Sequence, residues 1–265
     1  MYAFNYVKPA SLADAQSALS GADDGALLAG GQTLLPTLKQ RLASPSDLVD
    51  LAGIAELSGI RRDGDSVVIG AMTRHAEVAA SVEVSGAIPA LAALAGGIGD
   101  QAVRNRGTMG GSVANNDPAA DYPAGVLGLG ATVRTTAREI AADDFFTGMF
   151  ETALNEGEII KEIAFPVPEK AAYVKFPNPA SRYAMVGVFV AKTAGGVRVA
   201  VTGAGGGGVF RVAEYESALA ANFSASAVAD GVVASANLNS DIHADAEYRA
   251  HLIAVMTRRA VEAAG

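Results

Sequence analysis

A pair of adjacent glycines occurs twice in this sequence, each time among hydroxyl and amide side chains. Gly30-Gly31 stands in "LLAGGQTLLP", between an apolar run and a helix-like segment, and Gly110-Gly111 stands in "RNRGTMGGSVANN". Glycine lacks a Cβ and permits positive φ, so successive backbone N–H groups can converge on one anion at a helix start. Either pair alone fits an ordinary turn, whereas two such pairs favour a ligand with two linked phosphates. The sequence therefore predicts a dinucleotide.

Composition limits the class of protein. The chain has 265 residues, half of them apolar, which is enough for one large domain or two modest ones. The net charge of −8 and the scattered basic residues argue against nucleic acid or an anionic membrane surface as the main partner. The sequence has no cysteine, so a disulfide or a thiolate-ligated iron–sulfur cluster is excluded from this chain. Any such cluster would have to sit on another chain.

The N-terminus "MYAFNYVKPASLADAQ" lacks the basic start and apolar stretch of a signal peptide. No run approaches the ~20 apolar residues that span a bilayer, so we expect a cytoplasmic protein. The three histidines, His75, His243 and His251, have no HExxH spacing and fit surface positions on helices. A histidine metal site is not expected.

The first 55 residues predict a compact β-α-β-α-β lobe. Ser11 can cap its first helix, and Gln32 or Thr33 can cap the second, with Pro36 in the first turn and Leu38 and Leu42 facing inward. The strands are expected at residues 4–7, 25–30 and 47–51.

A second lobe is expected from about residue 56 to 168, where Pro166 and Pro168 mark a boundary. Its strands are predicted at 66–73, 131–135 and 158–167, its helices at 74–81, 88–98 and 122–130, and a loop or short helix at 145–150. The remainder, 169–265, predicts an antiparallel sheet covered by helices, with strands at 173–176, 183–193 and 197–205, a hairpin turn at 195–196, and helices at 212–221, 224–236 and 246–264.

Two further motifs have more than one interpretation. Asp117 and Asp121, beside the second glycine pair, could hold Mg²⁺. We favour the alternative in which one accepts hydrogen bonds from a ribose or adenine and the other caps a turn. The run "GAGGGG", Gly203–Gly208, satisfies G-x-G-x-x-G, but no helix follows it directly and no βαβ unit continues it. It is interpreted as a flexible connection between the sheet and the helices.

The segments "LLAGGQTLLPTLKQRLASPSDLVDL" and "VRNRGTMGGSVANNDPAADYPA" resemble the flavin-binding signatures of the medium subunits of molybdenum hydroxylases, a family that includes the carbon monoxide dehydrogenase medium subunit and the flavin domain of xanthine dehydrogenase. The resemblance covers essentially the whole chain. It implies an α+β protein, with a two-lobed α/β FAD-binding domain of the vanillyl-alcohol oxidase (PCMH) type over 1–168, lobes at about 1–55 and 56–168, and a smaller α+β domain over 169–265.

The resemblance also implies which residues bind FAD. The first lobe would wrap the pyrophosphate through Ala29, Gly30, Gly31, Gln32 and Thr33, and the second through Thr108, Gly110, Gly111 and Ser112. Asp121 would contact the nucleotide portion, the Ile160 backbone would lie near the flavin ring, and Lys175 would lie beside it, where a cation stabilises the negative charge of reduced flavin. Tyr173 would pack against the ring or belong to the core. The sequence departs from the family pattern at Gln32-Thr33, where some members have His-Ser, and at Ser112, where many have Asn or Asp.

The family implies a division of labour among subunits. A large molybdopterin-binding subunit oxidises the substrate, a small subunit carries two [2Fe–2S] clusters, and the complex is usually a dimer of heterotrimers. This chain would pass electrons from those clusters through FAD to an external acceptor, and no catalytic residue is assigned to it. One alternative is a self-contained FAD oxidoreductase, for which the sequence offers no assignable acid or base. Another is a non-redox nucleotide-binding module that uses "GAGGGG".

Overall fold

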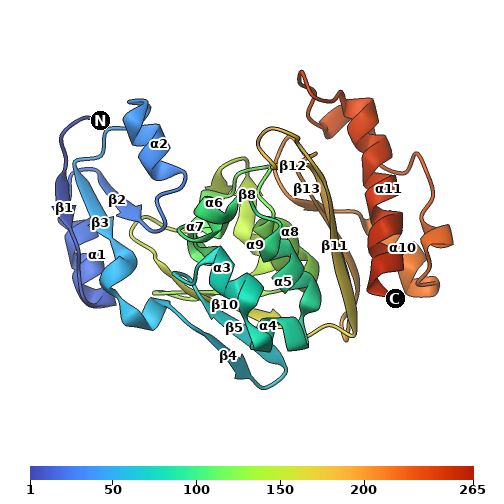
Figure 1. The fold of residues 1–265 in the computed structure, drawn as a ribbon, viewed down its shortest axis with the longest axis horizontal. Helices are drawn as coiled ribbons and strands as arrows, with labels where there is room; N and C mark the ends of the chain where they lie inside the picture. The colour runs from blue at the N-terminus through green and yellow to red at the C-terminus, as the bar shows by residue number, and fades with distance from the viewer.

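The computed structural model describes residues 1–265, which form three units in a row (Figure 1). The first unit is a parallel sheet with the strand order β1-β3-β2, and the prediction of β-α-β-α-β is confirmed. Ser11 caps the first helix as expected, because the Asp14 N–H donates to its Oγ at 3.2 Å. The elements are β1 (Asn5–Val7), α1 (Leu12–Ser20), β2 (Gly25–Leu28), α2 (Leu34–Lys39) and β3 (Asp47–Asp50).

One inward-facing leucine of this unit was predicted wrongly. Leu38 is buried, but Leu42 is 74% exposed. The helix α2 ends at Lys39, and Arg41 adopts a left-handed φ of 60°. Helical periodicity therefore stops before Leu42, so this side chain no longer shares a face with Leu38.

The second unit is built on a five-stranded antiparallel sheet with the order β4-β5-β10-β6-β7. Its strands are β4 (Ile60–Asp63), β5 (Ser66–Gly70), β6 (Thr132–Thr135), β7 (Glu139–Ala141) and β10 (Ile160–Pro166). Its helices are α3 (His75–Ala80), α4 (Val82–Ala87), α5 (Pro89–Gly96), α6 (Gln101–Arg104), α7 (Met109–Asn115), α8 (Tyr122–Leu129) and α9 (Ala142–Phe145). The segment expected as a loop or short helix at 145–150 instead begins a hairpin of β8 (Phe146–Gly148) with β9 (Glu151–Thr152), whose turn is tied to Asn116 by side-chain hydrogen bonds.

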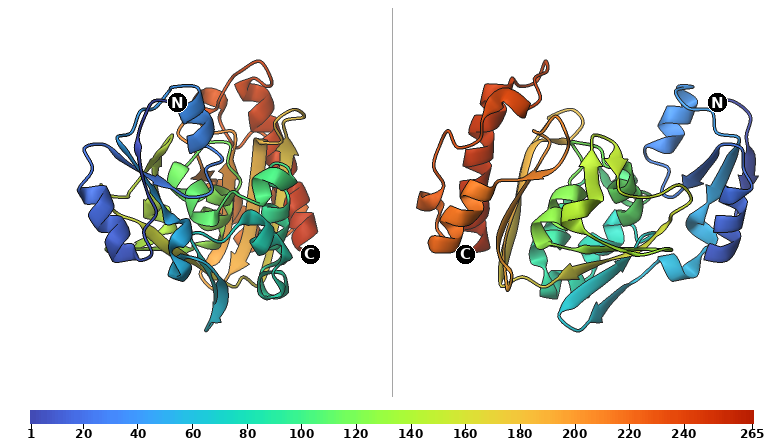
Figure 2. Two further views of the ribbon diagram at one scale, coloured as in Figure 1. Left: turned by 60° about the vertical axis from the view of Figure 1, so that its left-hand side comes forward. Right: turned by 180° about the vertical axis from the view of Figure 1, so that it is seen from behind.

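The third unit is an antiparallel sheet that lies between two layers of helices (Figures 1 and 2). Helices α5 and α8 pack on one face of the sheet, while α10 and α11 cover the other. The central strand β12 is buried over most of its length because both faces are covered. The elements are β11 (Lys170–Pro177), β12 (Ala184–Thr193), β13 (Gly196–Thr202), β14 (Phe210–Arg211), α10 (Ala213–Ala221) and α11 (Ala246–Ala264). No helix in the structure is both long enough and apolar enough to cross a bilayer.

Two predictions for the third unit were wrong. The expected helix at 224–236 is reduced to single 3₁₀ turns at Ala225–Ala227 and Ser235–Asn237. Two of its backbone carbonyl oxygens accept hydrogen bonds from side chains of the neighbouring helices instead. Tyr215 donates to the Ala229 oxygen, and Arg258 donates to the Val228 oxygen. The "GAGGGG" run joins β13 to β14 within the sheet and is held in place, with the Gly203 N–H donating to the Pro118 oxygen at 2.8 Å.

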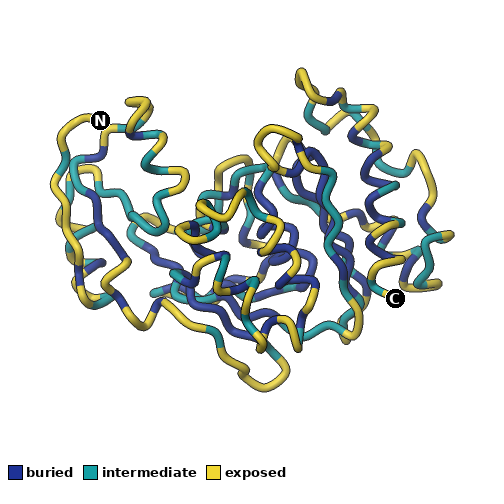
Figure 3. The backbone as a smooth tube through the Cα atoms, viewed as in Figure 1, coloured by how far each residue is buried: buried dark blue, intermediate teal, exposed yellow.

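The buried residues form one large central core, a second core under α10 and α11, and a small one in the first unit (Figure 3). The central core extends into the third unit through Phe189 of β12. The small core contains six buried residues, and two of them, Leu57 and Ile159, lie beyond residue 55, in the second unit. The first unit is thus attached to the rest of the molecule by little apolar surface.

Replacing Gly128 by alanine is expected to lower the free energy of unfolding by about 1–3 kcal/mol. The added Cβ would lie 2.8 Å from Cδ1 of Phe189, whose ring is fully buried. Gly86 in α4 is a matched control, because nothing lies within 4 Å of its added Cβ. Alanine there should raise stability by about 0.5–1 kcal/mol through helix propensity. Urea unfolding measures the free energy of unfolding of both variants. If Gly128→Ala and Gly86→Ala changed it equally, the packing argument would be contradicted.

Candidate cofactor site

A cavity of about 700 Å³ lies where the three units meet. The first unit contributes the end of β2 and the start of α2, the second unit contributes the loops before α6 and α7, and the third contributes residues 180–183. Its volume is in the range of sites for small molecules and cofactors. The sequence-predicted residues in its lining are Ala29, Gly30, Gly31, Gln32, Thr33, Thr108, Gly110, Gly111, Ser112, Asp121 and Ile160.

The first glycine loop presents a row of free donors. None of the backbone N–H groups from Ala29 to Thr33 donates a hydrogen bond within the chain. Thr33 occupies the N-cap position of α2, as one alternative predicted, yet its side chain makes no capping bond. Gly31 takes a left-handed φ of 72°, which turns the chain between strand and helix. Because the first N–H groups of a helix have no intrahelical partners, this loop can present its free donors to an anionic ligand.

The second glycine loop is organised differently. The Gly110 N–H donates to the Ala71 oxygen at 2.8 Å, and the Gly111 N–H donates to Oγ1 of Thr108, which caps α7. Both backbone N–H groups therefore already donate hydrogen bonds within the chain and are not free to bind a ligand. The donors left without a partner are the Thr108 N–H and the Ser112 hydroxyl. The glycine at 110 is required by close packing, because its Cβ would lie 2.5 Å from the Cβ of Ala71.

The two loops touch each other at their glycines. A Cβ on Gly30 would lie 2.1 Å from the Arg106 oxygen and 2.8 Å from Cα of Gly107. A Cβ on Gly111 would meet the Cβ of Ala29 at 3.4 Å. The two motifs that the sequence singled out are thus brought together in the cavity lining, and the backbones of the two units pass close to each other at Gly30.

Asp121 anchors a buried polar cluster at the cavity wall. Its carboxylate lies 3.0 Å from Nζ of Lys175 and accepts a hydrogen bond from the Tyr173 hydroxyl. Lys175 also donates to the Gly97 oxygen at 2.8 Å. Burial raises the pKa of Asp121 above its ordinary value, although Lys175 and Tyr173 offset part of this effect. Neither Tyr173 nor Lys175 lines the cavity; both hold Asp121 from behind.

The neighbouring carboxylate, Asp117, has a structural partner. Its Oδ1 accepts from the Ala119 N–H at 2.8 Å, which confirms the turn-capping alternative for one member of the pair. No group of three histidine, cysteine or acidic side chains is placed to hold a metal ion. The two aspartates therefore have separate roles in the wall.

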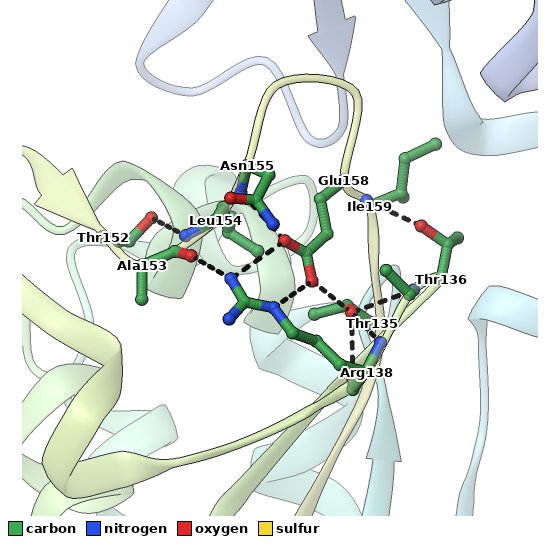
Figure 4. A network of polar contacts seen from close by, with 10 residues as sticks. Thr135, Thr136, Arg138, Thr152, Ala153, Leu154, Asn155, Glu158 and Ile159 are labelled. Atoms are coloured by element: carbon green, nitrogen blue, oxygen red, sulfur yellow. Dashed lines mark hydrogen bonds and ion pairs between the residues drawn. The ribbon is translucent and has the colours of Figure 1, made fainter.

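A second buried carboxylate, Glu158, belongs to a polar network (Figure 4) that fixes a loop of the cavity lining. It accepts from the Thr135 hydroxyl at 2.6 Å, from Nε of Arg138 at 3.2 Å and from the Asn155 N–H at 2.8 Å. The next residues, Ile159 and Ile160, line the cavity. Sequence reasoning missed this network because its members come from two separate segments, 135–138 and 152–159.

Stability is expected to fall as the pH drops from about 4.5 to about 2 because of Glu158. Burial raises the pKa of Glu158, but hydrogen bonds from Arg138, Asn155 and Thr135 outweigh burial and lower it to about 2. The unfolded chain therefore binds this proton first on acidification, so the stabilisation present above pH 4.5 is lost toward pH 2. Acid-unfolding profiles of wild type and Glu158→Gln test this; a variant that loses stability over this pH range as steeply as wild type would contradict the assignment.

Sequence reasoning also misplaced His75. This side chain was expected on the surface, but it is 4% exposed and its ring centroid lies 5.2 Å from that of Tyr122. Burial, with a contribution from nearby Arg104, lowers the pKa of His75 to about 4. The other missed part of the lining is the loop containing Arg182, which has a left-handed φ of 64°, and Tyr183. The burial of His75 has no local sequence signal, because it depends on packing against Tyr122 and Gly107, which are distant from it in the sequence.

Comparison with known proteins places this arrangement in a family. Residues 2–168 match the family described as the FAD binding domain in molybdopterin dehydrogenase. The chain is 36% identical to the nicotine 6-hydroxylase medium subunit of Paenarthrobacter nicotinovorans, covering 99% of this chain and 98% of that one. It is also 36% identical to the carbon monoxide dehydrogenase medium chain of Afipia carboxidovorans, covering 98% and 96%.

Solved structures agree with the sequence comparison. The chain superimposes on carbon monoxide dehydrogenase from Hydrogenophaga pseudoflava with a TM-score of 0.91 and 36% identity, covering 98% of this chain and 96% of that one. The match to quinoline 2-oxidoreductase from Pseudomonas putida 86 has a TM-score of 0.89 and 30% identity, covering 99% and 96%. These likenesses confirm the predicted α+β fold class. The chain belongs to the family of FAD-binding medium subunits of molybdenum hydroxylases.

Proposed function

We propose that this chain is the FAD-carrying electron-transfer subunit of a heterotrimeric molybdenum hydroxylase, with the cofactor in the cavity between the units. The observation that carries the proposal is the row of unpaired N–H groups from Ala29 to Thr33, which faces a cavity shared with the second glycine loop. Free backbone donors at a helix start suit a diphosphate bridge. The division into a FAD-binding domain over 1–168 and a smaller domain over 169–265 is part of this proposal.

The residues have different tasks in binding. The first loop supplies backbone donors, and the second supplies the Thr108 N–H and the Ser112 hydroxyl. Asp121 is a carboxylate acceptor at the wall, and Ile160 offers backbone beside the ring. When bound, FAD exchanges one or two electrons, so it can couple one-electron clusters to a two-electron acceptor. That Lys175 and Tyr173 act at the ring stays a prediction, because in this structure both side chains hold Asp121.

The family of this chain and its lack of cysteine both support a proposal about its partner subunits. We infer that a large molybdopterin-binding subunit oxidises the substrate and that a small subunit with [2Fe–2S] clusters delivers the electrons to this chain. The relatives at 36% identity are themselves a medium subunit and a medium chain by name. Assembly as a dimer of heterotrimers in the cytoplasm completes the proposal.

The test is to co-purify the chain with the products of its neighbouring genes and to record visible spectra before and after adding substrate. A flavin band that substrate bleaches is the expected result. A complex without flavin, or with a flavin that no substrate reduces, would refute the proposal. Substrate turnover by the isolated chain would instead support a self-contained oxidoreductase, and colourless protein that retains a nucleotide would support a non-redox module.

A further inference from the structure

His75 is wedged between α8 and the second glycine loop. Its backbone N–H donates to the Gly107 oxygen at 3.0 Å, and its imidazole lies beside the ring of Tyr122. A Cβ on Gly107 would lie 2.5 Å from Nε2 of His75, so only glycine leaves room for the ring. Both residues belong to the cavity lining. The edge of the imidazole that carries Nε2 is therefore held against the loop.

The two ring nitrogens of His75 have different surroundings. Nδ1 is sealed from solvent and has no hydrogen-bond partner. Nε2 has no partner in the chain either, but it is not among the sealed atoms, and His75 is one of the residues that line the cavity. A neutral imidazole carries one N–H and one lone pair. Because a buried N–H without an acceptor is costly, the proton belongs on Nε2, where a bound ligand can accept it.

Gly107 links the imidazole to the first glycine loop. Its Cβ position lies 2.5 Å from Nε2 of His75, and its Cα lies 2.8 Å from the Cβ position of Gly30, so His75 and Gly30 pack against the same residue in the cavity lining. We propose that His75 is a cofactor-binding residue whose neutral Nε2–H donates to an oxygen of the ligand's diphosphate. The inference rests on the proposed function for the nature of the ligand, and it adds a side-chain donor to a site otherwise built from backbone.

Nuclear magnetic resonance of the full-length chain labelled with ¹⁵N-histidine tests the proposal directly. The other two histidines, His243 and His251, are exposed, so the buried one is readily assigned. We expect the Nε2–H tautomer in the free chain. ADP, which carries a diphosphate without flavin, should shift the His75 Nε2 resonance as FAD does, whereas riboflavin, which has no phosphate, should leave it unchanged. A proton on Nδ1, or saturation by ADP without a shift, would overturn the proposal.

Variants separate hydrogen bonding from packing. His75→Phe keeps a ring but removes the donor, so we expect ADP affinity by calorimetry to fall about tenfold, as for one lost hydrogen bond. His75→Gln can place an amide N–H near Nε2 and should recover most of the affinity, while exposed His251→Gln should match wild type. Affinity unchanged in His75→Phe, or no rescue by glutamine in a folded variant, would argue for a packing role only. If ADP shifts His75 but FAD does not bind, the flavin function fails and the diphosphate contact stands.

Discussion

Replacing Gly30 by alanine is expected to leave the purified chain almost free of FAD and to weaken FAD binding on the order of 100-fold. The new Cβ would lie 2.1 Å from the Arg106 backbone oxygen, a contact that no side-chain rotation relieves. The two loops must then separate, which costs about 1–3 kcal/mol and displaces the donors that face the ligand. Flavin absorbance of the purified protein and fluorescence titration of the apoprotein measure the loss.

Gly207→Ala provides a matched control for this substitution. Gly207 belongs to the "GAGGGG" run and has nothing within 4 Å of its added Cβ. The variant should retain a full complement of FAD. If Gly207→Ala lost the cofactor while Gly30→Ala kept it, the glycine-rich turn of the third unit would be the nucleotide site, and the proposed function would be wrong.

Replacing Lys175 by methionine is expected to destabilise the fold by about 3–5 kcal/mol, because it leaves the Asp121 carboxylate buried without its cation. The two side chains are 11% and 5% exposed, so water cannot take the place of the lysine. Removing the cation also raises the pKa of Asp121 further. Denaturant unfolding at pH 7 measures the change, and part of the loss should return at lower pH as Asp121 is protonated.

The double variant Lys175→Met with Asp121→Asn separates charge from packing. Removing both charges should recover most of the stability, since an uncharged pair in the same space no longer carries the cost of an isolated buried ion. FAD affinity of the double variant then reports what the Asp121 carboxylate contributes to the ligand. A double variant as unstable as the single one would show that the aliphatic chain of Lys175, rather than its charge, is what the fold needs.

Elements with a strong local pattern could be predicted from the sequence. The helix Ala246–Ala264 was placed to the residue because its apolar positions repeat with helical spacing, and the structure adds that Asp245 caps it. The parallel first unit followed from short apolar strands alternating with a capped helix. The segment at 224–236 has the same alanine-rich composition, but Tyr215 and Arg258 compete for its carbonyl groups. That competition is a tertiary effect, which a local pattern does not contain.

The site was partly predictable for a similar reason. Glycine pairs carry a local signal, so the loops at Gly30 and Gly110 were found, together with Asp121. The sequence did not reveal that the Gly110 amide is already used by Ala71, whereas the amides from Ala29 to Thr33 are free. The burial of His75 and the Glu158 network were also missed, because each joins segments of the second unit that are distant in the sequence and meet only in the folded chain.

The small apolar core of the first unit affects how the protein resists local opening and proteolysis. Because the apolar cluster of this unit has six buried residues and two of them lie in the second unit, this sheet is expected to open before the rest of the molecule does. A ligand bound between that sheet and the second unit binds only the closed form. At a free concentration of a hundred times its dissociation constant, the ligand raises the free energy of opening by about 2.7 kcal/mol. Newly made chains that have not met flavin would therefore expose their N-terminal segment to proteases, and cellular flavin supply would set how much of the subunit survives to be assembled.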